Sequence, residues 1–203
     1  MNAHATVPER LLAVATDLFV RKGYDAVSVR DITGRARANL GAVTYHFGSK
    51  EALFHATIDR MGGAFVERFA TLAAGRGTPL ERIAAIVRMV LAEPHLPAPV
   101  MILRALATDQ PLPPPLVRIM RRNLATMMGL IRDGQRDGSI RRGDPQLLAL
   151  SVLAQPFLLR VASRIPRDVI GVDRSDPRTQ QRLVAHVVDT IHRSLATHPK
   201  HLP

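Results

Sequence analysis

The chain has 203 residues, 46% of them hydrophobic, which is enough for two small helical units or one larger domain with an ample core. It has no cysteine, which excludes disulfides and thiol redox sensing. Its net charge of +11 favours a polyanionic partner. We expect no signal peptide, and the most apolar stretch, residues 147–159, is too short and interrupted to cross a bilayer. The simplest interpretation is a cytoplasmic protein with no membrane partner.

Three short helices are predicted near the N-terminus. Apolar residues from Leu11 to Phe19 recur at helical spacing, and Gly23 marks the end of that helix. Ser28 and Asp31 form a variant of the capping box that starts a second helix. Asn39 is expected to cap a third helix over residues 40–47. Two helices at this spacing predict a helix-turn-helix, whose second helix can lie in a DNA major groove; a plain helical hairpin is the alternative.

The residue types in this segment suit a DNA surface. Gly41 allows close backbone approach, and Thr44 offers a hydroxyl and a methyl group to a base edge. Tyr45 and His46 can bind phosphate oxygens, and Lys50 adds charge at a helix N-terminus. The alternatives are a partly buried Tyr45, a structural His46 and a solvated Lys50. The candidate DNA-binding residues are Ser28, Arg37, Asn39, Leu40, Gly41, Thr44, Tyr45, His46 and Lys50.

The remaining sequence predicts further helices separated by proline and glycine. We expect helices over residues 50–74, 79–93, 100–109, 115–136, 145–163 and 177–197, with a kink at Pro156. Residues 118–142 carry seven arginines against two aspartates. A solvated helix face is the simpler interpretation of this basic segment, and a second nucleic-acid contact is the alternative.

Residues 9–54 resemble the N-terminal domain of the TetR (tetracycline-repressor-like) transcriptional regulators. The matching residues are Ala15, Leu18, Phe19, Gly23, Tyr24, Ile32, Ala36, Gly41, His46, Phe47, Lys50, Glu51 and Leu53. The resemblance implies an all-α homodimer, with a DNA-binding domain over residues 1–55 and an effector-binding and dimerisation domain over residues 56–203. The family usually has glycine in the turn where this chain has Arg37, so we expect a slightly altered turn. The family also usually has tyrosine where this chain has Thr44. Whether Tyr45 makes the contact of that tyrosine instead is left open.

The last two long helices are predicted to be apolar on more than one side, which requires more than one packing partner. The resemblance implies that they form the dimer interface; satisfaction of both faces within one subunit is the alternative. The candidate interface residues are Leu150, Ala154, Leu158, Val161, Val184, Val187, Val188 and Ile191.

The expected effector pocket is less defined. Methionine and phenylalanine suit an adaptable apolar site but are more often plain core, and Arg104 could hold a carboxylate or a structural ion pair. The candidate ligand-binding residues are Met61, Phe65, Met89, Met101, Arg104, Met120, Met127 and Phe157.

An enzyme is the main competing class, but we find no nucleophile elbow, no zinc-protease motif and no phosphate-binding glycine loop. The eight histidines lack metal-ligand spacing, and no cofactor is expected. The sequence therefore predicts a regulator, most simply a repressor, that binds palindromic operator DNA as a dimer and is released by a largely apolar small molecule. A DNA-binding protein without an effector is the alternative.

Overall fold

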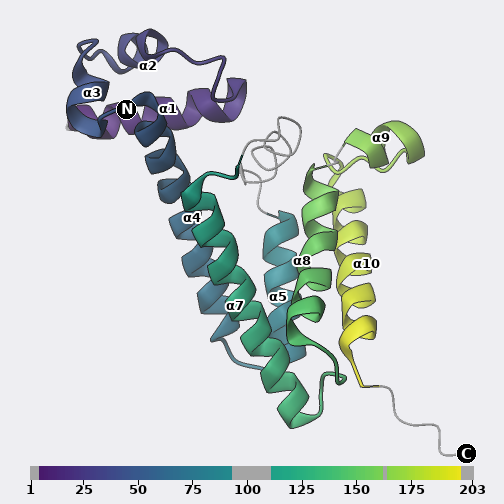
Figure 1. Ribbon diagram of the computed structural model, residues 1–203. Coiled ribbons are helices and arrows are strands. Elements are labelled where there is room, and N and C mark those ends of the chain that lie inside the picture. The colour runs from purple at the N-terminus through teal and green to yellow at the C-terminus, as the bar shows by residue number, and fades with distance from the viewer. Residues whose placement is uncertain (1–4, 93–110, 162–163, 198–203) are drawn as a thin grey trace, which may run out of the picture. The chain divides into compact units, whose positions relative to one another are not determined.

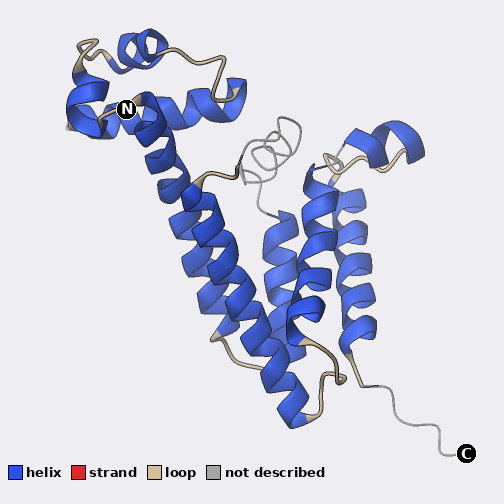
Figure 2. Cartoon of the chain, viewed as in Figure 1, coloured by secondary structure: helices blue, strands red, loops and turns tan. Residues whose placement is uncertain are grey.

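The computed structural model describes residues 5–92, 111–161 and 164–197, and apart from one isolated β-bridge the regular elements in these ranges are all helices (Figures 1 and 2). This confirms the expected all-α fold. None of the helices described has the length and hydropathy that a bilayer span requires. The helices are α1 (Val7–Lys22), α2 (Val29–Ala36), α3 (Ala42–Phe47), α4 (Lys50–Ala73), α5 (Pro79–Ala92), α7 (Pro114–Asp137), α8 (Pro145–Val161), α9 (Arg164–Ile170) and α10 (Pro177–Leu195).

The described residues divide into two compact units. The first comprises residues 5–64 and 111–119, and the second comprises residues 65–92, 120–161 and 164–197. Helices α4 and α7 each contribute residues to both units. The domain boundary after residue 55 stays a prediction.

The first unit packs α1, α2, α3 and the start of α4 around one hydrophobic cluster. Its fully buried members come from all four helices and the α1–α2 connection: Leu11, Ala15, Leu18, Phe19, Val27, Ile32, Ala36, Val43 and Leu53. The predicted capping box starts α2, because the Ser28 N–H and hydroxyl both donate to the Asp31 carboxylate, at 2.8 and 2.6 Å. These hydrogen bonds lower the pKa of Asp31.

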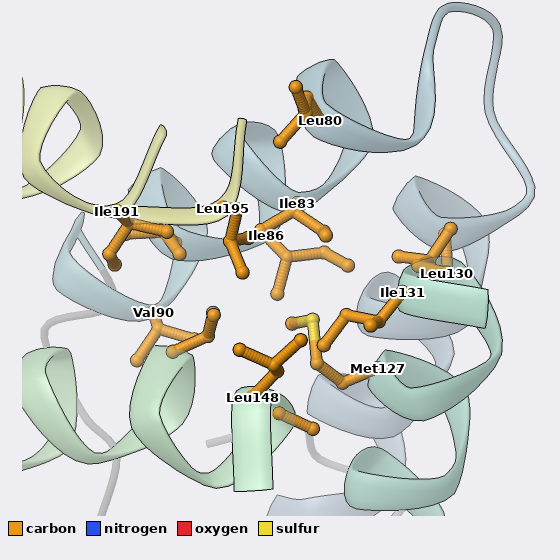
Figure 3. Packing of buried hydrophobic residues seen from close by; sticks show 14 of the residues in the cluster. Leu80, Ile83, Ile86, Val90, Met127, Leu130, Ile131, Leu148, Ile191 and Leu195 are labelled. Carbon is orange, nitrogen blue, oxygen red and sulfur yellow. The ribbon is translucent and has the colours of Figure 1, made fainter. Parts of the chain in front are cut away.

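The second unit has its own core, formed by α5, α8, α10 and the second parts of α4 and α7 (Figure 3). Ile86 of α5, Met127 of α7 and Ile191 of α10 are each at most 5% exposed. Leu148 of α8 points into the same cluster. Burying an aliphatic side chain of this size stabilises a fold by about 1.5–3 kcal/mol, so this cluster is the main stabilising feature of the unit.

Several expected boundaries need correction. Helix α9 was not predicted, although Pro166 in its first turn and Gly171 after its end, at φ 68°, are typical of helix boundaries. Helix α10 ends at Leu195, two residues earlier than expected, whereas α8 is described to Val161 and its expected last two residues lie outside the described ranges. Pro156 lies inside α8. The helix expected over residues 100–109 lies outside the described residues.

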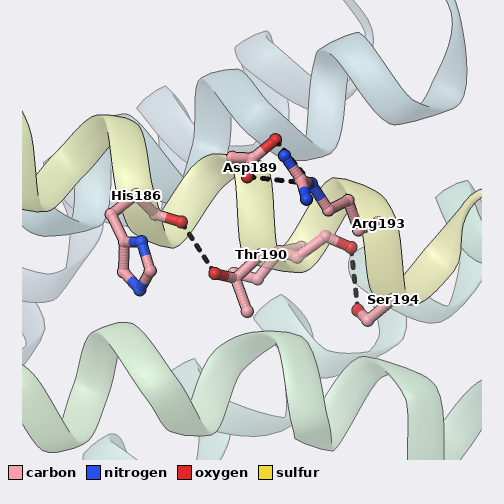
Figure 4. Close-up of polar contacts among 6 residues, drawn as sticks. His186, Asp189, Thr190, Arg193 and Ser194 are labelled. Atoms are coloured by element: carbon pink, nitrogen blue, oxygen red, sulfur yellow. Dashed lines mark hydrogen bonds and ion pairs between the residues drawn. The ribbon is translucent and has the colours of Figure 1, made fainter.

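The prediction that both last long helices are apolar on several sides holds only for α8. Leu147, Leu150 and Leu158 of α8 are 59–63% exposed and, with exposed Ala154, form a stripe along the helix. In α10, Val187 and Ile191 are buried in the core instead. The exposed residues of α10 include the polar ones labelled in Figure 4, among them an ion pair between Asp189 and Arg193 at 3.0 Å. The hydroxyl of Thr190 donates to the His186 carbonyl, and that of Ser194 to the Ile191 carbonyl.

Two glycines of α7 make a matched pair for testing this packing. A Cβ at Gly134 would lie 2.5 Å from side-chain atoms of buried Ile140, whereas a Cβ at Gly129 would meet nothing within 4 Å. We expect Gly134→Ala to lower the free energy of unfolding by about 1–3 kcal/mol through overpacking. Gly129→Ala should raise it by roughly 0.5–1 kcal/mol, because alanine favours the helix. Chemical denaturation of both variants measures this, and equal effects would contradict the packing at Gly134.

Candidate nucleic-acid interface

The turn between α2 and α3 keeps a left-handed residue, contrary to the expectation that arginine would alter it. Arg37 has φ 50° and ψ 51° and is the one non-glycine residue with positive φ among those described. The Ala38 N–H donates to the Thr33 carbonyl at 2.9 Å, and the Arg37 N–H donates to the Gly34 carbonyl at 3.3 Å. This is the hydrogen-bond pattern with which many helices end, so the backbone forms the turn without glycine.

A side chain that the sequence analysis did not single out supports this turn. The Arg10 guanidinium donates to the Ala36 carbonyl at 3.1 Å and to the Ala5 carbonyl at 2.8 Å. The first contact ties α1 to the last carbonyls of α2, which have no partner within their own helix. The 26-residue separation of Arg10 and Ala36 hides this contact from local sequence patterns.

Helix α3 starts later than expected. The helix begins at Ala42 rather than Leu40, and Asn39 does not cap it as predicted. Instead, the Asn39 side-chain oxygen accepts a hydrogen bond from the Gly41 N–H at 3.0 Å, which shapes the turn before the helix. Leu40 is half exposed in this turn.

Helix α3 buries one side and exposes the other. Val43 is 1% exposed in the core of the first unit, and Phe47 packs against the same cluster. Thr44, Tyr45 and His46 are all exposed, with Tyr45 at 85%. The Tyr45 ring meets the His46 ring edge-on at 4.8 Å between centroids. A partly buried Tyr45, one of the alternatives from the sequence, is therefore wrong.

Lys50 is positioned by an aromatic ring. Its ammonium nitrogen lies 4.2 Å from the centre of the Tyr24 ring, within the range of a cation–π interaction. Tyr24 in turn packs against Phe54, at 4.7 Å between centroids. Partial burial lowers the pKa of Lys50. Tyr24 was not a candidate site residue, yet it limits where the Lys50 charge can lie.

The other DNA candidates lie at the helix ends of the same unit. Ser28 precedes α2 and contacts Asp31, while Arg37 is exposed in the turn after α2. All nine candidates therefore belong to the first unit, and all but Lys50 are exposed. No group of His, Asp and Glu in the described ranges could hold a metal ion.

The ligand-binding candidates are less coherent. Met89 and Met127 are fully packed in the core of the second unit, where they fill space between helices. Met61, Phe65 and Phe157 are half-buried, and Met120 is exposed. Met101 and Arg104 lie outside the described residues.

Comparisons with known proteins agree with this geometry. Residues 11–57 match the family model described as bacterial regulatory proteins, tetR family. The HTH-type transcriptional repressor Rv3405c of Mycobacterium tuberculosis is 45% identical over 56 residues, which span 28% of this chain and 30% of that protein.

Solved structures extend the likeness to the whole fold. A TetR/AcrR-family regulator from Thermobifida fusca has a TM-score of 0.63 at 26% identity, covering 91% of this chain and 96% of its own. AibR, solved with isovaleryl coenzyme A and operator DNA, has a TM-score of 0.69 at 19% identity, covering 91% and 97%.

The α2–turn–α3 geometry defines a helix-turn-helix. Residues 11–57 therefore form an N-terminal domain of the tetR type, and the fold of the chain is similar to that of a TetR/AcrR-family regulator.

The left-handed residue in the turn gives a direct test. Arg37→Gly should raise the free energy of unfolding by about 0.5–1 kcal/mol, because glycine adopts this conformation without the steric cost that arginine has. Arg35→Gly is the matched control: Arg35 lies inside α2 and is also exposed, so glycine there should destabilise by a similar amount. Denaturant titrations that show both variants destabilised would contradict the geometry of the turn.

Proposed function

We propose that this protein is a ligand-responsive repressor that binds palindromic operator DNA as a dimer. The observation that carries the DNA-binding role is the exposed side of α3, where Thr44, Tyr45 and His46 lie together beside a lysine fixed at the start of α4. A DNA-binding protein acts where the chromosome is, so we also propose a cytoplasmic location.

The chemistry of this surface divides into sequence readout and backbone contact. Thr44 can approach a base edge, where its methyl group suits a thymine. Tyr45 and His46 carry hydrogen-bonding groups for phosphate oxygens. Lys50 and Arg37 supply charge for the backbone, while Asn39, Leu40 and Gly41 shape the turn that leads into α3.

Two single substitutions should separate these roles. Lys50→Ala should weaken binding to all duplexes, because one phosphate contact is lost in each subunit. The slope of log affinity against log salt concentration should become shallower by about one for each subunit bound. Thr44→Ala should change preference at one base position in each half-site, at a cost of about 1–3 kcal/mol. Fluorescence anisotropy against a selected operator and its point variants measures both effects.

Arg76→Ala is the charge-matched control, since Arg76 is exposed in the α4–α5 connection within the second unit. It should leave both the affinity and the salt slope unchanged. Unchanged operator binding in a Tyr45→Ala/Lys50→Ala double variant would show that this surface does not bind DNA.

The apolar stripe on α8 supports the proposed dimer. Leu150, Ala154 and Leu158 are exposed although apolar, which is the pattern of a helix that needs a partner outside its own subunit. Val184 and Val188 of α10 are half-buried and can extend the interface, whereas Val187 and Ile191 are already in the core. The side chain of Val161 is not described. The proposed interface is therefore centred on α8, with a narrower contribution from α10 than the sequence predicted.

Leu158→Glu should yield a folded monomer, because Leu158 is 62% exposed and adds little to the subunit core. The monomer should lose operator affinity. In the dimer, two helix-turn-helix units bind one duplex about 34–36 Å apart, and this bivalent binding raises the affinity. Val20→Glu, at an exposed apolar position of α1, is the control and should remain dimeric. Sedimentation velocity measures the oligomeric state of each variant. A wild-type chain that is monomeric at micromolar concentration would refute the dimer.

The effector is proposed from the second unit and from a neighbour. AibR was solved with both a coenzyme A thioester and operator DNA. In this chain, half-buried Phe65 and Phe157 belong to the second unit, and α4 continues from Lys50 to Phe65 without a break. An effector that prefers one arrangement of α4 would shift the population away from the DNA-binding state. Linkage then requires operator DNA to weaken effector binding by the same factor; equal affinities with and without operator would favour a regulator without an effector.

A further inference from the structure

A surface hollow lies at the C-terminal end of α7, within the second unit. It has a volume of about 640 Å³ and is lined by Gly129, Arg132, Asp133, Gln135, Arg136, Arg142 and Gly143. Three arginines and one aspartate give its lining a net charge of +2. Volumes of roughly 300–1,000 Å³ are typical of small-molecule sites. The hollow belongs to the basic segment 118–142, for which the proposed function has no role.

Two of the three arginines have no partner in the part of the chain that the structure describes. The Arg136 guanidinium pairs with the Asp133 carboxylate, which neutralises the acid of the hollow. Among the described residues, no hydrogen bond or ion pair engages the guanidinium groups of Arg132 and Arg142. Each therefore keeps all five of its N–H donors available. Planar guanidinium groups bind phosphate and carboxylate oxygens in pairs, so this arrangement suits an anion.

The wall that carries Arg142 is held in place. The Gln135 side-chain amide donates to the carbonyls of Arg141 and Gly143, at 3.1 and 2.8 Å. The Arg141 guanidinium donates to the Ser194 carbonyl at 2.7 Å, and the Arg141 N–H donates to the Leu195 carbonyl at 2.8 Å. The turn is thus tied to both α7 and α10, and ligand binding would cost little loop ordering.

Gly129 leaves the lining of the hollow open. It lies in the middle of α7, where glycine costs about 0.5–1 kcal/mol relative to alanine. Packing does not require it, because a Cβ there would meet no atom within 4 Å. Gly134, five residues further along α7, is instead required by the close approach of Ile140. Gly129 thus keeps this part of the hollow free of side-chain atoms, although its packing would accept a larger residue.

We propose that this hollow binds a small anion bearing two or more phosphate groups, of the size of a nucleoside diphosphate. The unpaired charges of Arg132 and Arg142 line one open hollow of about 640 Å³, a volume that suits a compact polyanion better than duplex DNA. The site is separate from the helix-turn-helix surface, since all its residues belong to the second unit. The inference does not depend on the proposed repressor function.

Isothermal titration calorimetry of the full chain with ADP and with inorganic pyrophosphate tests this proposal. We expect saturable binding of at least one probe, with one molecule per chain. Arg132→Ala and Arg142→Ala should each weaken it by about ten-fold or more, because each removes a charge-assisted contact. Arg122→Ala, an exposed arginine of α7 outside the hollow, is the matched control and should bind like the wild type. Gly129→Leu keeps every charge but occupies the hollow, and it should also lose binding.

Three results would overturn the proposal. Absence of binding for both probes is the first. An equal loss in Arg132→Ala and Arg122→Ala is the second, because it would show only a general charge effect. The third is a Gly129→Leu variant that is folded by circular dichroism and binds normally. A loss of affinity for non-operator duplex DNA in Arg132→Ala, with probe binding unchanged, would assign the arginines to a nucleic-acid surface instead.

Discussion

The DNA-binding unit depends on the left-handed turn at Arg37 that ends α2. Reversing the chain direction within a few residues requires one left-handed backbone position, and here an arginine occupies it. The steric cost is offset by backbone hydrogen bonds at the helix end and by the Arg10 guanidinium, which satisfies the Ala36 carbonyl. With this turn in place, Val43 enters the core and the opposite side of α3 must face solvent.

Much of this unit could be predicted from sequence because its signals are local. The capping box at Ser28 and the spacing of Val43 and Phe47 are contained within a few residues, and the structure has the predicted contacts. An altered turn was expected at Arg37, because that expectation used only the conformational preference of arginine. It did not include the contacts that support the turn. Arg10 and Tyr24 support the site from distant parts of the sequence, and residue type does not show such contacts.

The second unit shows the limit of apolar patterns. Both α8 and α10 are rich in apolar residues. Val187 and Ile191 of α10 are nevertheless buried in the core of the second unit, whereas Leu150 and Leu158 of α8 are exposed. Apolar spacing identifies a face but not the neighbour that covers it. The same holds for methionine: Met127 could equally have lined a ligand site, and its burial shows that it fills the core. Likewise, Gly129 and Gly134 differ only in what lies beside them.

The two units combine different requirements in one chain. The first exposes side chains proposed to contact DNA, such as Tyr45, and a compact aromatic and aliphatic cluster lies beneath them. The second presents an apolar stripe on α8 and an arginine-lined hollow on α7, neither of which contributes to the core.

Selection of random duplex DNA by the 203-residue chain, followed by sequencing, is the most direct test of dimeric operator binding. We expect enrichment of inverted repeats with a fixed half-site spacing. Selected DNA without any enriched symmetric sequence would show that the protein does not bind a palindrome as a dimer.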